Sequence, residues 1–197
     1  VATLLERIYR MTSGTFDAYK TVGVIVPYRN QIAMIRREIA RKGIPELAHI
    51  SIDTVERYQG SQRDVIIYSF TIQNFSQLNF LTANTFQEDE YVIDRKLNVA
   101  ITRARKQLFL TGNPQILGAN ITFYKLMEYI RMNNGYIQTD TDAFCRGDFI
   151  LPEYMPGWDL QSENYPLSEA FDHAFRHIVE ENSRINKDEA RNRELTA

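Results

Sequence analysis

Two patterns of hydrophobic and polar positions alternate along the first two thirds of the chain. Short, largely apolar segments predict four strands, over residues 22–26, 49–53, 64–70 and 107–111. Apolar residues that recur every three or four positions predict four helices, over residues 2–11, 30–42, 94–105 and 123–132. The first strand segment is apolar throughout, which is typical of a strand buried on both faces of a parallel sheet. This alternation favours an α/β fold with right-handed crossovers.

The alternation breaks in two places. Residues 73–91 are polar and irregular, which predicts a long loop or insertion. After Gly135 the chain carries prolines and isolated aromatic residues, followed by a helical pattern over 167–192. We therefore expect one α/β domain over residues 1–143 and a C-terminal extension over 144–197, formed by a Pro/aromatic segment and a helix.

Length, net charge and composition exclude few classes of function. The 197 residues carry a net charge of -2 and a pI of about 6.0, which gives no overall nucleic-acid signature. No apolar run approaches the ~20 residues that cross a bilayer, so no membrane association is expected. The chain starts at Val1 without a Met or a signal-peptide pattern, so we expect a piece of a longer intracellular protein, cytoplasmic or nuclear (nucleoid in a bacterium). The single Cys145 fits a reducing compartment.

The helix predicted over 94–105 carries cations on its polar side. Leu97 and Ala100 fall on one face by helical spacing, and Arg103 lies on the flank of the other. A planar, permanently charged guanidinium can stabilise charge on a transferred phosphoryl group, and a neighbouring domain can supply such an arginine. The spacing alone leaves open a second interpretation, a solvated basic face on a surface helix.

Two polar segments follow predicted strands. Thr54 could bond a nucleic-acid phosphate, and Gln59 and Gln62 offer donors and acceptors suited to ribose or phosphate oxygens. Gly60 indicates a positive φ or a close approach to a ligand. An ordinary polar turn is the alternative for this segment.

Residues Tyr28 and Arg29 come directly after the first strand, at the end where open α/β sheets bind ligands. The Tyr28 ring could stack on a base and Arg29 could hold a phosphate. The alternative is that Tyr28 packs over the sheet edge and Arg29 is solvated.

Three segments together resemble a known family. Residues 24–31 (VIVPYRNQ) are similar to motif IV, residues 54–69 (TVERYQGSQRDVIIYS) to motif V, and residues 97–105 (LNVAITRAR) to motif VI, of the second RecA-like motor domain of superfamily 1 helicases. The similarity is to the branch that includes the nonsense-mediated-decay and DNA-replication nuclease-helicases. It covers roughly residues 22–112 in the right order, and it implies a RecA-like three-layer fold with a mainly parallel sheet.

The resemblance implies a role for each group of residues. Arg103 would be the catalytic arginine that reaches the γ-phosphate of ATP. The ATP-binding residues would be Gly60, Gln62, Arg103 and Arg105, and those that bind single-stranded DNA or RNA would be Tyr28, Arg29, Gln31, Thr54 and Gln59. ATP and Mg²⁺ would be held mainly by a first RecA-like domain of the same polypeptide. No glycine of this chain is followed by lysine, so it lacks the phosphate loop G-x-x-x-x-G-K-[ST] and should be inactive alone.

One departure keeps alternatives open. The family usually has Glu where this chain has Gln62, which removes a charge beside the nucleotide. The chain could therefore belong to a degenerate helicase, as a non-catalytic module that binds nucleic acid or a partner. An unrelated α/β enzyme with its own pocket is a further alternative. No metal site is expected, because His173 and His177 lack further ligands nearby in the sequence.

Overall fold

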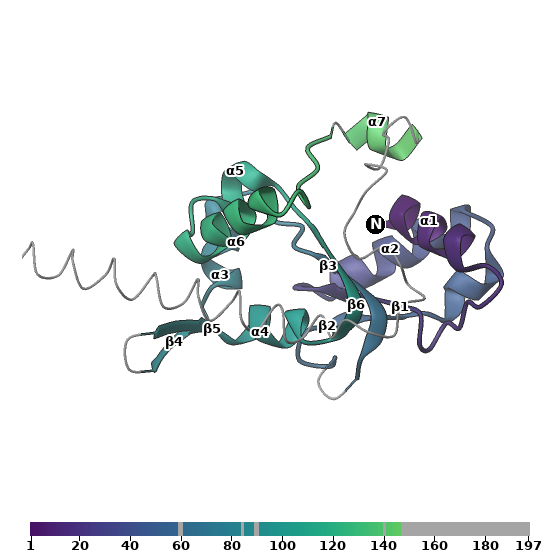
Figure 1. Cartoon of the computed structure of the whole chain (residues 1–197), viewed down its shortest axis with the longest axis horizontal. Helices are drawn as coiled ribbons and strands as arrows, with labels where there is room; N and C mark the ends of the chain where they lie inside the picture. The colour runs from purple at the N-terminus through teal and green to yellow at the C-terminus, as the bar shows by residue number, and fades with distance from the viewer. Residues whose placement is uncertain (59–60, 84, 89–90, 140, 147–197) are drawn as a thin grey trace, which may run out of the picture.

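A computed structural model describes residues 1–58, 61–83, 85–88, 91–139 and 141–146. Four strands form a sheet in the order β2-β1-β3-β6, and all neighbouring pairs are parallel (Figure 1). The strands are β1 (Val22–Val26), β2 (Ser51–Thr54), β3 (Arg63–Ser69) and β6 (Ala104–Thr111). The four predicted strands are thus confirmed, with bounds that shift by up to three residues.

Successive side chains of the central strands enter two separate cores, because the side chains of a strand point alternately to opposite faces. Val24 and Ile67 belong to one core, whereas Ile25, Ile66 and Tyr68 belong to the other. All five are buried. This double burial explains why the strand segments are apolar throughout instead of alternating.

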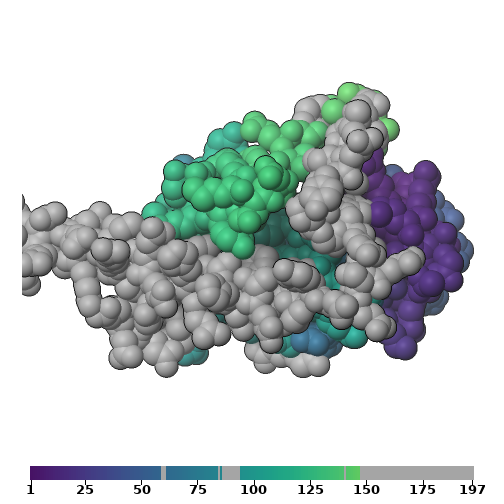
Figure 2. All heavy atoms as spheres, in the orientation of Figure 1, coloured from purple at the N-terminus to yellow at the C-terminus, as the bar shows by residue number. Residues whose placement is uncertain are grey.

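Helices cover both faces of the sheet, which gives three layers. The helices α1 (Ala2–Thr12) and α2 (Asn30–Arg41) and the 3-10 helix η1 (Pro45–His49) pack on one face. The helices α4 (Arg95–Ile101), α5 (Pro114–Leu117) and α6 (Ile121–Met132) pack on the other. In the space-filling view, purple α1 lies at the right and the green α6 region lies to its left (Figure 2). The predicted α/β fold with a parallel sheet is confirmed.

The prediction of a long loop over 73–91 is wrong. This segment contains helix α3 (Phe75–Leu81) and an antiparallel hairpin of β4 (Thr85–Glu88) and β5 (Tyr91–Asp94). The Asn74 side chain caps α3 by accepting a hydrogen bond from the Gln77 backbone N–H at 2.9 Å, and Leu78 and Leu81 are buried under the helix. The many polar residues of the segment hid this short apolar stripe.

The helix predicted over 94–105 is too long. α4 ends at Ile101, Thr102 and Arg103 form a turn, and β6 begins at Ala104. The sheet explains the early end, because Ala104 pairs with Arg63 of β3. Helical spacing continues through this turn by coincidence.

The C-terminal part is described only in its first residues. Helix α7 (Thr141–Arg146) crosses the boundary expected between residues 143 and 144, and the Phe144 side chain packs against the core under α1 and α2. The helix predicted over 167–192, with His173 and His177, lies outside the described residues. Within the described part of the chain, no helix is long and apolar enough to cross a membrane.

Candidate functional site

The predicted site residues divide between the two edges of the sheet. Because all four strands are parallel, their first residues meet at one edge, the amino edge, and their last residues meet at the other, the carboxyl edge. The amino edge carries Val22, Ser51, Arg63 and Ala104, and the carboxyl edge carries Val26, Thr54, Ser69 and Thr111. Gln62, Arg103 and Arg105 therefore lie at the amino edge. Tyr28, Arg29, Gln31 and Thr54 lie at the carboxyl edge.

At the amino edge, β3 and β6 bring two distant segments into direct contact. The Arg63 backbone N–H donates to the Arg103 carbonyl at 3.0 Å, and the Gln62 Nε2 donates to the Thr102 carbonyl at 3.4 Å. The second bond needs an amide, because a glutamate at position 62 has no hydrogen to donate. Gln62 and Arg103 are thus neighbours in space although 40 residues separate Gln62 from Thr102.

The Arg103 side chain folds back on the end of α4. Its Nε donates to the Val99 carbonyl at 3.1 Å and its Nη2 to the Thr102 hydroxyl at 3.0 Å. A cation is favourable at a helix C-terminus, where backbone carbonyls lack partners. None of the described residues accepts a hydrogen bond from the third nitrogen, Nη1, and the side chain is half-buried.

The carboxylate of Asp64 faces two cations of β6 at this edge. Asp64 faces both Arg105, with Nη1 at 3.9 Å, and Lys106, with Nζ at 3.5 Å. The β3–β6 register shifts between Arg63 and Val65, a bulge that gives β6 one extra residue beside Asp64. One carboxylate therefore serves two cations, and the positive charge of Arg103 adds to them. Such a surface attracts a polyanion.

A guanidinium that sequence analysis did not single out lies beneath this cluster. Arg63 donates from Nη2 to the Ser51 hydroxyl and from Nη1 to the Gln62 carbonyl, both at 2.7 Å. Its Cζ lies 5.9 Å from the centre of the Tyr58 ring. Tyr58 is fully buried against Gly23, where an added Cβ would lie 1.7 Å from the tyrosine oxygen. Only the bare backbone of glycine admits this ring.

At the carboxyl edge, helix α3 holds Tyr28. The Tyr28 hydroxyl donates to the Gln77 carbonyl at 3.3 Å, and its ring stacks on Phe80 with centroids 5.8 Å apart and an interplanar angle of 24°. Burial raises the pKa of Tyr28. Tyr28 is thus a half-buried ring with a fixed orientation.

The other residues expected at the carboxyl edge differ in exposure. Arg29 is exposed immediately before α2. Gln31 is half-buried, and its Oε1 is buried with no hydrogen-bond partner among the described residues. Thr54 is 6% exposed, and its hydroxyl bonds Glu56. Gln59 and Gly60, the remaining members of the predicted set, lie outside the described residues.

An ion pair that the sequence did not indicate links the carboxyl edge to α4. Lys96 Nζ lies 3.2 Å from Glu56 Oε1 and 5.4 Å from the centre of the Phe80 ring. Burial alone would raise the pKa of Glu56, but hydrogen bonds from its own backbone N–H, Thr54 and Lys96 outweigh burial and lower it.

Asp94 caps α4 and has the opposite shift. Burial raises its pKa, although hydrogen bonds from the backbone N–H groups of Leu97 and Lys96 act to lower it.

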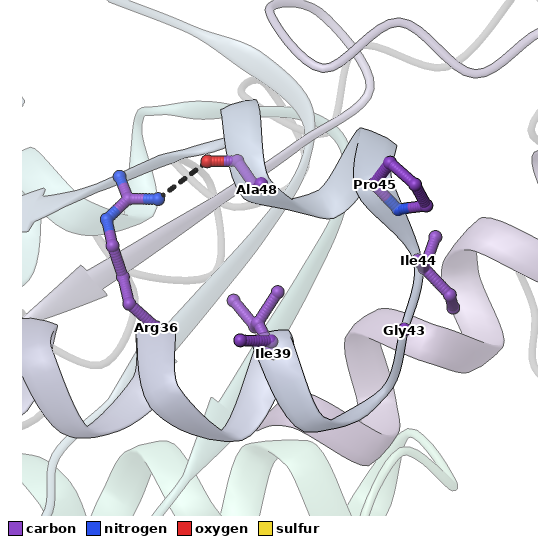
Figure 3. A pocket seen from close by; sticks show the side chains of 7 residues that line it. Arg36, Ile39, Gly43, Ile44, Pro45 and Ala48 are labelled. Carbon is purple, nitrogen blue, oxygen red and sulfur yellow. Dashed lines mark hydrogen bonds between the residues drawn. The ribbon is translucent and has the colours of Figure 1, made fainter.

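A pocket lies between α2 and η1 (Figure 3). Ile39, Ile44 and Pro45 line it, together with Arg36, whose Nη1 donates to the Ala48 carbonyl at 2.9 Å and whose Nη2 donates to the Ile50 carbonyl at 3.3 Å. The guanidinium is thus occupied by the backbone. Among the described residues, no cluster of three His, Cys, Asp or Glu side chains could hold a metal ion.

Comparison with known proteins agrees with the fold and with the order of the motifs. A family model described as an AAA domain matches residues 1–115. Human RNA helicase Mov10l1 is 34% identical over 124 residues, which is 60% of this chain and 9% of the relative. Mouse RNA helicase Mov10l1 is 32% identical over 126 residues, which is 61% of this chain and 10% of the relative. Helicase sen1 of Schizosaccharomyces pombe is 36% identical over 97 residues, which is 49% of this chain and 5% of the relative.

These matches define the class of the domain. The parallel sheet covered by helices on both faces is a RecA-like α/β domain. The chain belongs to the AAA-domain family of the matching model, as the second RecA-like motor domain of a superfamily 1 helicase of the nonsense-mediated-decay branch. It spans about a tenth or less of the length of the relatives named above.

Proposed function

We propose that this chain is the C-terminal motor half of an ATP-dependent helicase or translocase that acts on single-stranded nucleic acid inside the cell. The observation that carries the proposal is the contact of Gln62 and Arg63 with the 102–103 turn at the amino edge. This contact holds the Arg103 turn at the edge that also carries Arg105 and Lys106, opposite the edge of Tyr28 and Arg29. A motor needs this separation, because it must hold a nucleotide and a strand at the same time.

On the nucleotide side, Arg103 supplies the arginine finger. Its two bonds to Val99 and Thr102 join a charged donor to neutral acceptors and are worth about 2 kcal/mol net each, whereas bonds to a charged phosphate oxygen are stronger. A phosphate oxygen can therefore replace them. The guanidinium then stabilises the charge that develops on the transferred phosphoryl group. Gly60, Gln62 and Arg105 contact the same nucleotide from this domain.

The rest of the nucleotide site comes from another domain. We propose that ATP and Mg²⁺ are bound mainly by a first RecA-like domain of the same polypeptide, across the cleft from Arg103. The present sequence has no phosphate loop of its own. The isolated chain should therefore neither hydrolyse ATP nor unwind a duplex.

On the nucleic-acid side, we propose that the sugar-phosphate backbone of the single strand is bound by Arg29, Gln31, Thr54 and Gln59. The Tyr28 ring stacks on a base. The half-buried Tyr28 ring is fixed by Phe80 and Gln77, and the exposed Arg29 is its neighbour. Backbone contacts tolerate any sequence and weaken with salt. Two of the relatives are named RNA helicases, which favours RNA as the strand.

The test is ATP turnover by the full-length protein, with and without single-stranded RNA or DNA, in wild type and Arg103→Ala. We expect strand-stimulated turnover that falls by about 10³-fold in the variant while ATP affinity stays within about threefold. Arg41→Ala is the matched control, because Arg41 is an exposed arginine paired with Glu38 on the surface of α2. It should keep the wild-type rate.

Two outcomes would contradict the proposal. Arg103→Ala at the wild-type rate would remove the arginine finger. An inactive wild type that still binds the strand would replace the motor with the non-catalytic module of a degenerate helicase. Gln62→Glu would then be the first reversion, because it restores the residue that the family usually has.

A further inference from the structure

We propose that Arg63 is the positioning residue of the nucleotide side, which fixes the Arg103 turn through a guanidinium clamp between β2 and β3. This inference rests on the proposed function, because it assigns Arg63 a role that acts through Arg103. Arg63 itself does not contact the nucleotide in this proposal.

The clamp has three anchoring contacts. Nη2 of Arg63 binds the Ser51 hydroxyl at the first residue of β2, and Nη1 binds the Gln62 carbonyl, each at 2.7 Å. The Tyr58 ring lies 5.9 Å from the Arg63 Cζ. The fork of a guanidinium can make both bonds at once, whereas the point charge of a lysine cannot.

The clamp reaches Arg103 through two hydrogen bonds. The Arg63 backbone N–H donates to the Arg103 carbonyl at 3.0 Å, and the adjacent Gln62 side chain donates to the Thr102 carbonyl at 3.4 Å. Holding residues 62–63 against Ser51 therefore also holds the 102–103 turn. Displacement of a reacting group by about 1 Å can cost two orders of magnitude in rate, so this clamp bears directly on the position of the finger.

The energetics argue against a purely structural reason for the arginine. Among the described residues, no carboxylate lies within ion-pair distance of Arg63, and its Nε is buried without a hydrogen-bond partner. A half-buried charge with an unsatisfied donor is unfavourable for stability. An apolar side chain of similar length would avoid both costs, but it could not clamp Gln62 to Ser51.

The experiment compares three variants of the full-length protein by single-turnover ATP hydrolysis. Arg63→Met removes the clamp, and we expect the rate to fall about tenfold with strand affinity within about twofold of wild type. Ser51→Ala removes one anchor and should cost about threefold. Arg41→Met is the matched control, because Arg41 is an exposed arginine whose described ion pair is with Glu38 of the same helix, α2. It should keep the wild-type rate.

A double-variant cycle separates positioning from general damage. If Arg63 acts through Arg103, then Arg63→Met should change the rate by less than about twofold in an Arg103→Ala background. The same factor in both backgrounds would overturn the clamp, as would a wild-type rate for Arg63→Met or a parallel loss of strand affinity.

Two further results separate a failure of the clamp from a failure of the variant to fold and from a failure of the proposed function. If Arg63→Met does not fold, as judged by its thermal unfolding, Ser51→Ala decides the proposal alone, and a wild-type rate there overturns it. If Arg103→Ala itself retains the wild-type rate, the proposed function fails before the clamp is tested.

Discussion

The amino and carboxyl edges of the sheet are built in different ways. At the amino edge, the contacts come from strand pairing, so Gln62 and Arg103 are held together by backbone carbonyls one residue from the ladder. At the carboxyl edge, the contacts come from side chains on helices, since Tyr28 is held by Phe80 and by the backbone of α3. Pairing of β3 with β6 gives the proposed nucleotide side a fixed frame, whereas the proposed nucleic-acid side depends on how α3 packs.

This difference in construction suits each edge to the ligand that we propose for it. The proposed finger, which must meet a phosphate within fractions of an ångström, lies one residue from the β3–β6 ladder. A surface that must release and rebind a moving strand lies on side chains, which exchange partners more easily than a sheet does. Helix α4 runs between the two edges, with Asp94 at its start and the 102–103 turn at its end.

The largest effect is expected at the amino edge, from Gly23→Ala. The new Cβ would overlap the buried Tyr58 oxygen, so the ring and the nearby Arg63 must move. We expect the free energy of unfolding to fall by about 3 kcal/mol in denaturant titrations. Gly14→Ala is the control, because no atom lies within 4 Å of its added Cβ. A Gly23→Ala variant as stable as wild type would refute the close packing of Tyr58.

A smaller effect is expected at the carboxyl edge, from Arg29→Ala and Tyr28→Ala. Each should weaken single-strand binding by the full-length protein about tenfold and leave the KM for ATP unchanged. Salt titrations distinguish the two roles. Arg29→Ala should reduce the salt slope of binding by about one unit, because a phosphate contact is lost, whereas Tyr28→Ala should leave the slope as it is. Equal slopes for both variants would contradict this assignment.

The smallest effect is expected at the start of α4, from Asp94. Asp94→Ala removes the oxygen that accepts from the Leu97 N–H at 3.0 Å and should lower the free energy of unfolding by about 1 kcal/mol. Asp94→Asn keeps an acceptor and removes the buried charge, so at pH 7 it should be at least as stable as wild type.

The pH dependence of this pair of variants follows from the raised pKa of Asp94. Because burial raises the folded-state pKa, the Asp94 contribution to stability is fully present below the unfolded pKa and is lost as the pH rises through the folded pKa. The advantage of Asp94→Asn over wild type should therefore grow between about pH 4 and pH 7 in thermal unfolding. An advantage that shrinks over this range would mean that the carboxyl is stabilised in its charged form.

The sequence was sufficient for the sheet and for the side of it on which Gln62 lies, but not for the contacts at the amino edge. Segments such as Val22–Val26 are apolar on both faces, and a parallel order of strands then places Gln62 next to the end of α4. The position of Arg103 in a turn was missed, because helical spacing in 94–105 continues past the residue where strand pairing ends the helix.

The carboxyl edge could not be predicted from the sequence. Helix α3 is only seven residues long, and its stripe is interrupted by polar side chains, so periodicity is too weak to reveal it. The Phe80–Tyr28 stack and the Lys96–Glu56 ion pair join residues about 40 to 50 positions apart through side chains, and no local pattern records such contacts. At the amino edge, Arg63 was missed for the same reason, because its contacts are with Ser51 and Tyr58, and no local pattern records them.

Hydrogen exchange tests the separation of the two edges most directly. The full-length protein would be compared with and without a non-hydrolysable ATP analogue, and with and without a single strand. The account predicts that the analogue slows exchange at the amides of 61–63 and 102–105, and that the strand slows exchange at 28–31 and 54–58. Protection by both ligands at the same edge, or with the edges exchanged, would contradict the account.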